Sequence, residues 1–426
     1  MSIEPMRVYV LWAPARPDPS EDPGGRLADT LHRQLDALGM MRDGIGFRIP
    51  VRKRSANWRD TGRPQPIDWA AARSNIVILV IDDVMRNREG EWGDYVADIV
   101  RHIRDSSVAD MLLPVITSRG QGVSPFDALA TQGIVAPAPE AEQGWERWTR
   151  RITMYVMGAV WAHQRNAQRA MNRTMIEQSA TGQATSAEEL RRIGIFLSHA
   201  KMDGEGVALL LERFRDSRPN PTPDEVRVNS VEMFFDASDT VAGGAYAKQF
   251  EQAIKRGALL GILTDAYHGR PWCMWELLTA KKFGSPIVLW DLSHRGTLRS
   301  FPYLGNVPVI RTPDVRYQPD GGMERLDVTS ISDADIEHVL LALLSEAMRM
   351  EVWAADAQDR VNSHPAPGGE IVVCARPPEL AELVHHCMQG PIRVVYPDPP
   401  ICLHEKELIE TAFPQVSLVA LSELSS

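Results

Sequence analysis

Residues 76–81, Ile-Val-Ile-Leu-Val-Ile, form an unbroken aliphatic run. A strand with one face in water alternates apolar and polar residues, whereas a strand covered on both faces is apolar along its whole length. The run therefore predicts a strand of a parallel sheet with helices on both faces. Residues 259–263, Leu-Leu-Gly-Ile-Leu, repeat this pattern and predict a second strand of the same kind.

Strand and helix patterns alternate along the first part of the chain. Strands are expected at 6–13, 46–51, 76–81 and 111–117, and helices at 27–38, 95–103 and 144–172. Such alternation is typical of α/β proteins, in which helices join parallel strands. We therefore expect the α/β class with flavodoxin-like parallel sheets.

Three α/β domains are expected from the order of these patterns. The first covers 1–175 and ends in a long helix, and 176–190, rich in Gln, Ser, Thr and Ala, form a linker. The second covers 191–362 and also ends in a long helix. Residues 369–426 predict a small βαβαβ domain, which is too short for a large core and should therefore dock on the rest of the chain or on a partner.

Composition restricts the class of function. A net charge of −10 argues against a nucleic acid as direct ligand, because phosphate contacts need a basic surface. The sequence shows no signal peptide and no apolar run of membrane-spanning length, so we expect a cytoplasmic protein without a membrane partner. The 4 cysteines are too few for a disulfide scaffold in 426 residues and fit a reducing compartment.

A single carboxylate, Glu276, interrupts an otherwise apolar stretch at 269–283. Pro271 suits the first turn of a helix, and Gly284 followed by Pro286 ends it. Trp272 and Glu276 are one turn apart, and a second, buried face is predicted for the residues Cys273, Leu277 and Ala280. A carboxylate partly removed from water is common at active sites, although structural helix carboxylates also lie beside apolar residues.

Three motifs around this helix resemble a TIR domain, the Toll/interleukin-1 receptor module. They are Phe196-Leu-Ser-His-Ala200 after an opening strand, the segment from Phe235-Asp236 to Gly243-Gly244 after the next strand, and Trp272-Cys-Met-Trp-Glu276 at the start of the helix. The resemblance covers about residues 191–315 and rests on the order and spacing of the motifs.

The resemblance implies specific roles for these positions. In TIR domains that cleave NAD+, a Glu in the place of Glu276 is catalytic. NAD+ is then the substrate, with no cofactor and no metal. The positions carried over as substrate-binding are Phe196, Ser198, His199, Asp236 and Trp272.

The resemblance further implies a function for the chain. We expect an NAD+ glycohydrolase that releases nicotinamide and ADP-ribose or a cyclic form, in prokaryotic antiviral defence by NAD depletion. Such enzymes become active as homo-oligomers, and the assembly loop here would be Asp236, Gly243, Gly244 and Tyr246. Two other classes stay open: a non-catalytic TIR scaffold, and a receptor for a nucleotide signal or an upstream sensor protein.

The first domain repeats the order of the second, with an opening strand, an aliphatic strand, a Trp and finally a long helix. Four residues after Trp92, however, stands Val96, in the place that Glu276 holds after Trp272, and Asp94 is two residues out of register. We therefore expect a TIR-like domain without the catalytic residue. Unrelated flavodoxin-like sheets also share this order, so duplication is one of two interpretations.

Three further patterns have ordinary explanations beside functional ones. The basic stretch 48–59 suits a solvated loop or a phosphate-bearing ligand. Aromatic and Met residues between Trp145 and Trp161 recur at helical spacing and predict core packing. The group His385, His386, Cys387, Cys402 and His404 fits no standard zinc spacing, so no metal is expected.

Overall fold

The computed structural model divides into two compact units, which are treated separately below. They are Met1–Arg192 with Pro219–Val231, and Ile193–Arg218 with Glu232–Ser426. The structure describes residues 3–16, 18–36, 48–55, 63–105, 109–118, 133–136, 138–139, 141–177, 193–200, 206–207, 209–210, 212–213, 231–234, 246–294, 306–320, 323–363, 370–388 and 390–425.

The first unit contains a five-stranded parallel sheet in the order β2-β1-β3-β4-β5. All seven residues of the central strand β3 are buried, which confirms the prediction from the aliphatic run. The order matches the flavodoxin-like arrangement of doubly wound sheets. The strands are β1 (Arg7–Leu11), β2 (Val51–Arg54), β3 (Asn75–Ile81), β4 (Met111–Ile116) and β5 (Ile134–Val135).

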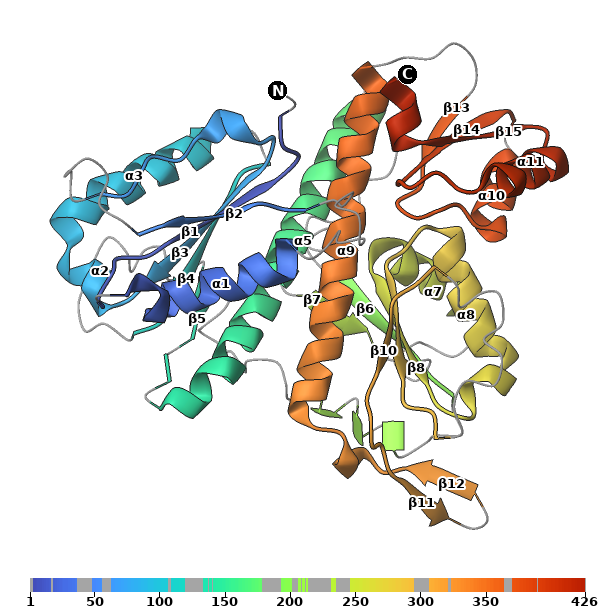
Figure 1. The fold of residues 1–426 in the computed structure, drawn as a ribbon, viewed down its shortest axis with the longest axis horizontal. Coiled ribbons are helices and arrows are strands. Elements are labelled where there is room, and N and C mark those ends of the chain that lie inside the picture. Colours follow the sequence, from blue (N-terminus) through green and yellow to red (C-terminus); the bar gives the residue numbers. More distant parts are fainter. Residues whose placement is uncertain are drawn as a thin grey trace. The chain divides into compact units, whose positions relative to one another are not determined.

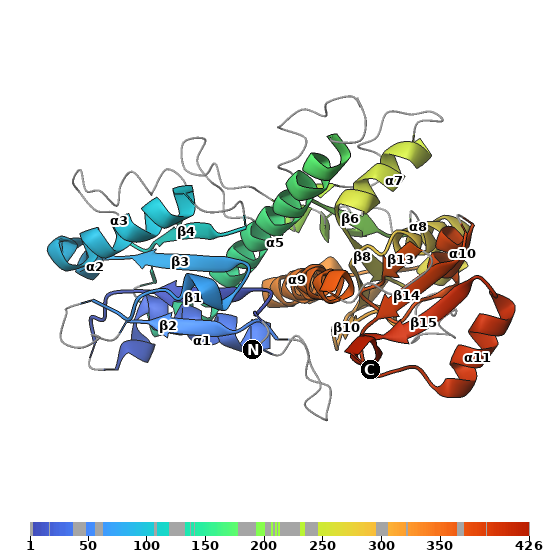
Figure 2. The ribbon, with the colours of Figure 1, turned by 90° about the horizontal axis from the view of Figure 1, so that it is seen from above.

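Helices cover both faces of this sheet. On one face α3 packs through Trp92, Val96 and Ile99 against β1 and β3. Helices α1 and α5 pack on each other, and Figures 1 and 2 show α1 on the side of the sheet opposite to α3. The helices are α1 (Pro23–Asp36), α2 (Asp83–Asn87), α3 (Glu89–Asp105) and α5 (Trp145–Glu177).

The second unit contains a sheet in the order β10-β9-β8-β6-β7, in which β6, β8, β9 and β10 pair in parallel. Numbered along the chain from β6, these strands repeat the order of the first unit. The sheet therefore shares the same flavodoxin-like arrangement. Its strands are β6 (Ile193–Ser198), β7 (Val231–Phe234), β8 (Ala258–Leu263), β9 (Ile287–Asp291) and β10 (Val309–Arg311).

One face of the second sheet is covered by α7 (Tyr246–Arg256) and α8 (Pro271–Lys282), whose apolar residues join those of β6, β8 and β9 in one core. The long helix α9 (Asp333–Ser363) contacts β8 and β9. Ser332 caps α9, because its Oγ accepts from the Asp335 backbone N–H and the Asp335 carboxylate accepts from the Ser332 N–H.

Residues 370–425, called the tail below, form a three-stranded parallel sheet in the order β13-β14-β15. Helices α10 and α11 pack on it around Leu383, Val394 and Leu418. This is the predicted βαβαβ pattern, shown in red in Figure 1. Its elements are β13 (Glu370–Val373), α10 (Leu380–Cys387), β14 (Ile392–Tyr396), α11 (Leu403–Ala412) and β15 (Val416–Ala420).

Some elements differ from the sequence predictions or were not predicted. Strand β2 begins at Val51, the residue at which the predicted strand ends, and its charged residues show no apolar alternation that could have revealed it. The antiparallel hairpin β11 (Tyr317–Asp320) and β12 (Met323–Leu326) was not predicted. In the part of the chain that the structure describes, no helix is long and apolar enough to span a membrane.

Candidate functional site

Helix α8 places the candidate catalytic residue. It begins at Pro271, whose missing N–H costs nothing in the first turn, and after Phe283 the chain turns at Gly284 with φ of 61°. Cys273, Leu277 and Ala280 are buried in the core between α8 and the sheet, as the helical spacing predicted. This face fixes the rotation of the helix about its axis.

The Glu276 side chain is only 4% exposed. Its Oε2 accepts a hydrogen bond of 2.6 Å from the Ser198 hydroxyl, and Ser198 is the last residue of β6. The carboxylate therefore lies at the carboxyl edge of the parallel sheet. A hydrogen bond to a carboxylate in a place with little water is stronger than one at the surface.

A third residue, Tyr267, completes a hydrogen-bonded chain behind the carboxylate. It follows β8, is fully buried, and its hydroxyl lies 2.8 Å from the Ser198 Oγ. Because the Ser198 hydroxyl donates its single proton to Glu276, the Tyr267 hydroxyl donates to Ser198. Burial raises the pKa of Tyr267, so its hydroxyl keeps its proton at neutral pH. The sequence analysis did not single out this residue.

The neighbouring strand leaves room for this chain of hydroxyls. Gly261 of β8 is paired with Ser198 of β6, and a Cβ at 261 would lie 3.3 Å from the Tyr267 hydroxyl and 2.8 Å from the Leu289 Cδ2. A side chain at 261 would therefore collide with its surroundings. A glycine in the middle of a strand often marks a place where another group approaches the backbone closely, and here that group is the Tyr267 hydroxyl.

The other residues of the opening motif have different surroundings. Phe196 is 6% exposed, and its ring packs against the Phe250 ring in the core, with 4.6 Å between the ring centroids. The His199 backbone carbonyl accepts a hydrogen bond of 3.3 Å from the Cys273 Sγ, which ties the end of β6 to α8. Within the motif, the Ser198 side chain binds the carboxylate directly.

Trp272 is 46% exposed, and its ring stacks on the Trp275 ring, with 4.8 Å between the ring centroids. It therefore presents an open aromatic surface one turn before the buried Glu276. Asp236, Gly243 and Gly244 lie outside the described residues, and of Tyr246 the structure gives only its place as the first residue of α7. The substrate-binding role of Asp236 and the assembly loop stay predictions.

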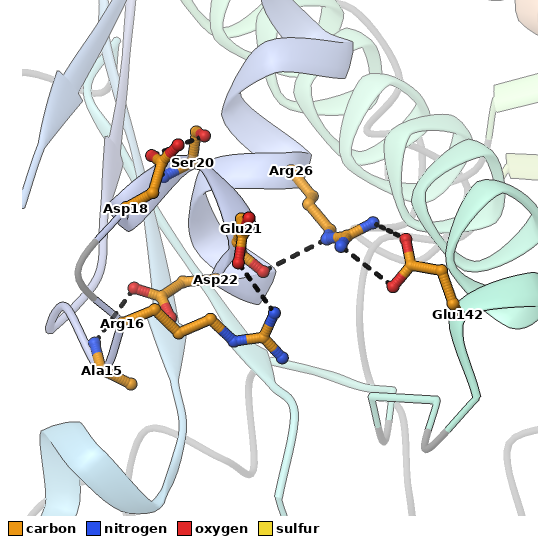
Figure 3. Close-up of polar contacts among 8 residues, drawn as sticks. All are labelled: Ala15, Arg16, Asp18, Ser20, Glu21, Asp22, Arg26 and Glu142. Carbon is orange, nitrogen blue, oxygen red and sulfur yellow. Dashed lines mark hydrogen bonds and ion pairs between the residues drawn. The ribbon is translucent and has the colours of Figure 1, made fainter.

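The corresponding edge of the first unit is built differently. Trp12 and Ala13 follow β1 and are buried, and the Asp22 carboxylate accepts a hydrogen bond of 3.0 Å from the Ala15 backbone N–H. Figure 3 shows how Arg26 of α1 binds both carboxylate oxygens of Glu142, at 2.8 and 3.1 Å. The Asp22 carboxylate thus holds the loop after β1, and the Arg26–Glu142 pair joins α1 to the turn before α5.

The first unit also differs at the position that corresponds to Glu276. Val96 is a buried core residue there, and the Asp94 side chain is 78% exposed and paired with Arg63 at 3.0 Å. A buried carboxylate like Glu276 is therefore absent from this position of α3. A cavity of about 490 Å³ lies between α3 and the segment 63–69, with walls formed by Ile67, Trp69 and Tyr95.

The remaining sequence patterns have structural roles. In α5 the buried aromatic and Met residues, as predicted, are Trp145, Trp148, Met154, Met157 and Trp161. The basic stretch contains β2, an edge strand rather than a loop, on which Arg52 and Lys53 are exposed. Among the described residues, no group of three or more His, Cys, Asp or Glu side chains is placed to hold a metal ion.

When the chain is compared with known proteins, no family model matches it and no curated protein matches it significantly.

Proposed function

We propose that the second unit is a TIR-type NAD+ glycohydrolase in which Glu276 is the catalytic residue. The observation that carries the proposal is the buried Glu276 carboxylate at the carboxyl edge of the sheet, bound by Ser198 from the end of β6. Ligands of open α/β sheets bind at this edge. The proposal also rests on the order of the three sequence motifs.

A single carboxylate is sufficient for this reaction. The leaving group of NAD+ is a cationic pyridinium, so nicotinamide departs as a neutral base and needs no acid. Hydrolysis of an O-glycoside, in contrast, uses two carboxyl groups, one of which protonates the departing oxygen. In the proposed mechanism Glu276 opposes the positive charge that develops on the ribose, and so stabilises the transition state more than the substrate.

The burial of Glu276 gives the enzyme an idle state. With 4% of this residue exposed, the ribose reaches the carboxylate only after a neighbouring group moves. We propose that assembly of TIR domains through residues 236–246 drives this movement, and that Trp272 then forms one wall of the open site. The products are nicotinamide and ADP-ribose or its cyclic form, and the biological result is NAD depletion in antiviral defence.

The test is nicotinamide release from NAD+ by the purified full chain at high protein concentration. Glu276→Gln should abolish release, because the amide keeps the shape of the side chain but lacks its charge. Asp94→Asn, which removes an exposed carboxylate from the first unit, should leave release at the wild-type level. The folded state of both variants is checked by circular dichroism.

The alternative of a non-catalytic scaffold predicts a different pattern. A scaffold would release no nicotinamide even as the wild type, and Glu276→Gln would only lower the free energy of unfolding, because Glu276 then only secures α8 to β6. Wild-type release by Glu276→Gln would refute the catalytic assignment. If Asp94→Asn lost nicotinamide release while Glu276→Gln kept it, the active site would be assigned to the first unit.

A second candidate function, reception of a nucleotide signal, is favoured by the cavity in the first unit. Its volume of about 490 Å³ lies in the range of small-molecule sites, and Trp69 and Tyr95 offer aromatic surfaces to a flat ring. This function is compatible with NAD+ cleavage by the second unit, since the two sites belong to different sheets.

A further inference from the structure

The last turn of α8 contains a fully buried lysine. The Lys281 side chain is 0% exposed, and its Nζ contacts both carboxylate oxygens of Glu379 at 2.7 Å. Glu379 belongs to the tail, where it caps the amino terminus of α10. Because a buried ammonium without a counter-ion is very unfavourable, this pair requires the tail to be present.

Two more charged residues of the tail are buried at the same contact. Glu382 is 4% exposed and completes the capping box of α10 by accepting from the Glu379 backbone N–H. Arg376 is 3% exposed, and its Nη1 and Nη2 atoms have no hydrogen-bond partner among the described residues. Two cations and two carboxylates therefore share one dehydrated volume, called the charge cluster below.

The ionisation of these groups reflects the lack of water. Burial is the main cause that raises the pKa of Glu382, to about 7, and the Arg376 charge opposes this shift. Burial also lowers the pKa of Lys281, against the effect of Glu379. A charge cluster of this kind tolerates the removal of one partner poorly, since the remaining charge stays buried and unpaired.

An aromatic contact and a hydrogen bond add to the junction between the tail and the rest of the second unit. The Phe283 ring meets the His385 ring edge-on at 5.6 Å, and Arg349 of α9 donates to the Ala375 backbone carbonyl at 3.3 Å. The tail therefore binds α8 and α9 together. The sequence predicted that the tail docks on the rest of the chain or on a partner. In the structure it docks on α8 and α9.

The junction lies on the same helix as the proposed catalytic residue. Lys281 is five residues after Glu276, about 7.5 Å along the helix axis at 1.5 Å per residue. Gly284, which ends the helix, is also close to the tail, because a Cβ there would lie 3.4 Å from the Glu382 Oε1. A helix moves as a rigid rod, so a tilt at Lys281 displaces Glu276 relative to Ser198.

We propose that Lys281 is a positioning residue, and that the tail, through Glu379, holds α8 in the orientation in which Glu276 receives the hydrogen bond of Ser198. The tail is then part of the working enzyme rather than an appended module. The catalytic half of this inference rests on the proposed NAD+ glycohydrolase, whereas the structural half does not.

The experiment measures amide hydrogen exchange of the full chain without NAD+, in peptides that cover residues 272–279. Lys281→Met should raise exchange in these peptides by about tenfold or more, although they precede the substitution. The double variant Lys281→Met with Glu379→Gln removes both charges, keeps an acceptor for the cap of α10 and should restore much of the protection. Lys282→Met, on the same turn, is the matched control and should exchange like the wild type.

Nicotinamide release then separates positioning from mere stability. Lys281→Met should lower kcat with little change in KM, and the double variant Lys281→Met with Glu379→Gln should recover much of kcat, since binding surfaces are untouched. Wild-type exchange at 272–279 in Lys281→Met would overturn the proposal, and so would raised exchange with an unchanged kcat. Should Lys281→Met fail to fold, Glu379→Gln makes the same test from the tail.

A failure of the glycohydrolase proposal would be recognised separately. The wild-type chain would then release no nicotinamide, while the exchange difference between Lys281→Met and Lys282→Met would still report whether the tail holds the orientation of α8.

Discussion

At the scale of single residues, the site depends on one hydroxyl. Ser198 donates to Glu276 and accepts from Tyr267, so it joins two buried polar groups from different elements. Both groups are buried, so bulk water cannot take the place of the hydroxyl. The arrangement of this edge is therefore more sensitive to Ser198 than to any exposed neighbour.

Ser198→Ala should both destabilise the protein and impair the proposed reaction. Loss of a hydrogen bond to a buried carboxylate costs about 1.5–3 kcal/mol, which corresponds to a fall in kcat of about tenfold to a hundredfold. Thermal unfolding and nicotinamide release measure the two effects. Ser285→Ala is the control: Ser285 is also buried and donates to the Ile254 carbonyl, so this variant should lose stability but keep kcat.

The sequence identified some of these residues and missed others for a physical reason. Glu276 and Ser198 belong to motifs on consecutive residues, and the structure brings them together. Tyr267 and the pair Lys281–Glu379 depend on contacts between distant segments. No local sequence pattern predicts such contacts, because the partners belong to different elements and are brought together only by the fold.

At the scale of elements, the buried strands were predictable and the edge elements were not. Residues 76–81 of β3 and all of β8 are apolar because both faces of these strands are covered, and this leaves a clear signal. Strand β2 and the hairpin β11–β12 contain charged residues and Pro319, so composition resembles that of a loop. Backbone pairing with a neighbour, and not side-chain burial, defines these elements.

The short helix α2 gives a prediction for pH dependence. Asp82 caps α2 by accepting from the Met85 N–H, and burial raises its pKa to about 6, with Asp22 and Asp83 adding to the shift. Because the folded state favours the protonated form, the contribution of Asp82 to stability falls as the pH rises from about 4 through 6.

Asp82→Asn keeps the cap and removes the titration. The Tm of this variant relative to the wild type should therefore be higher at about pH 7.5 than at about pH 5. Asp18→Asn is the comparison, since Asp18 also caps but is exposed, and hydrogen bonds from Ser20 lower its pKa. Its Tm difference should be equal at the two pH values, and an equal difference for Asp82→Asn would contradict the assignment.

At the scale of the whole molecule, two sheets with the same strand order differ at their carboxyl edges. The second presents a buried carboxylate there, and the first uses its polar groups to hold a loop. The order was predictable from alternating strands and helices. The difference in chemistry was predictable only at Glu276 and Val96, where one residue decides it.

Control of the proposed activity should come from assembly. Cellular NAD+ is indispensable, so an enzyme of this kind must stay idle until triggered, and contacts between copies form by mass action. Specific nicotinamide release should therefore rise with protein concentration, together with particle size measured by light scattering. Gly244→Arg, a bulky charge in the assembly loop, should suppress release although Glu276 is intact.

Restraint by the first unit would give a different result. Release per molecule would then be independent of dilution, the particles would remain monomers, and Gly244→Arg would stay active. That outcome would exclude assembly as the trigger and assign control to the first unit.

Because Gly261 has no side chain, the residues that positions 261 and 267 can accept depend on each other. The Tyr267 hydroxyl lies 3.3 Å from where a methyl group at 261 would stand, so a side chain at one position competes with the phenol at the other. A side chain at 261 is therefore expected only in a chain whose residues at 289 and 267 have become smaller or have shifted. Such a chain would have displaced or lost the proton donor behind its serine.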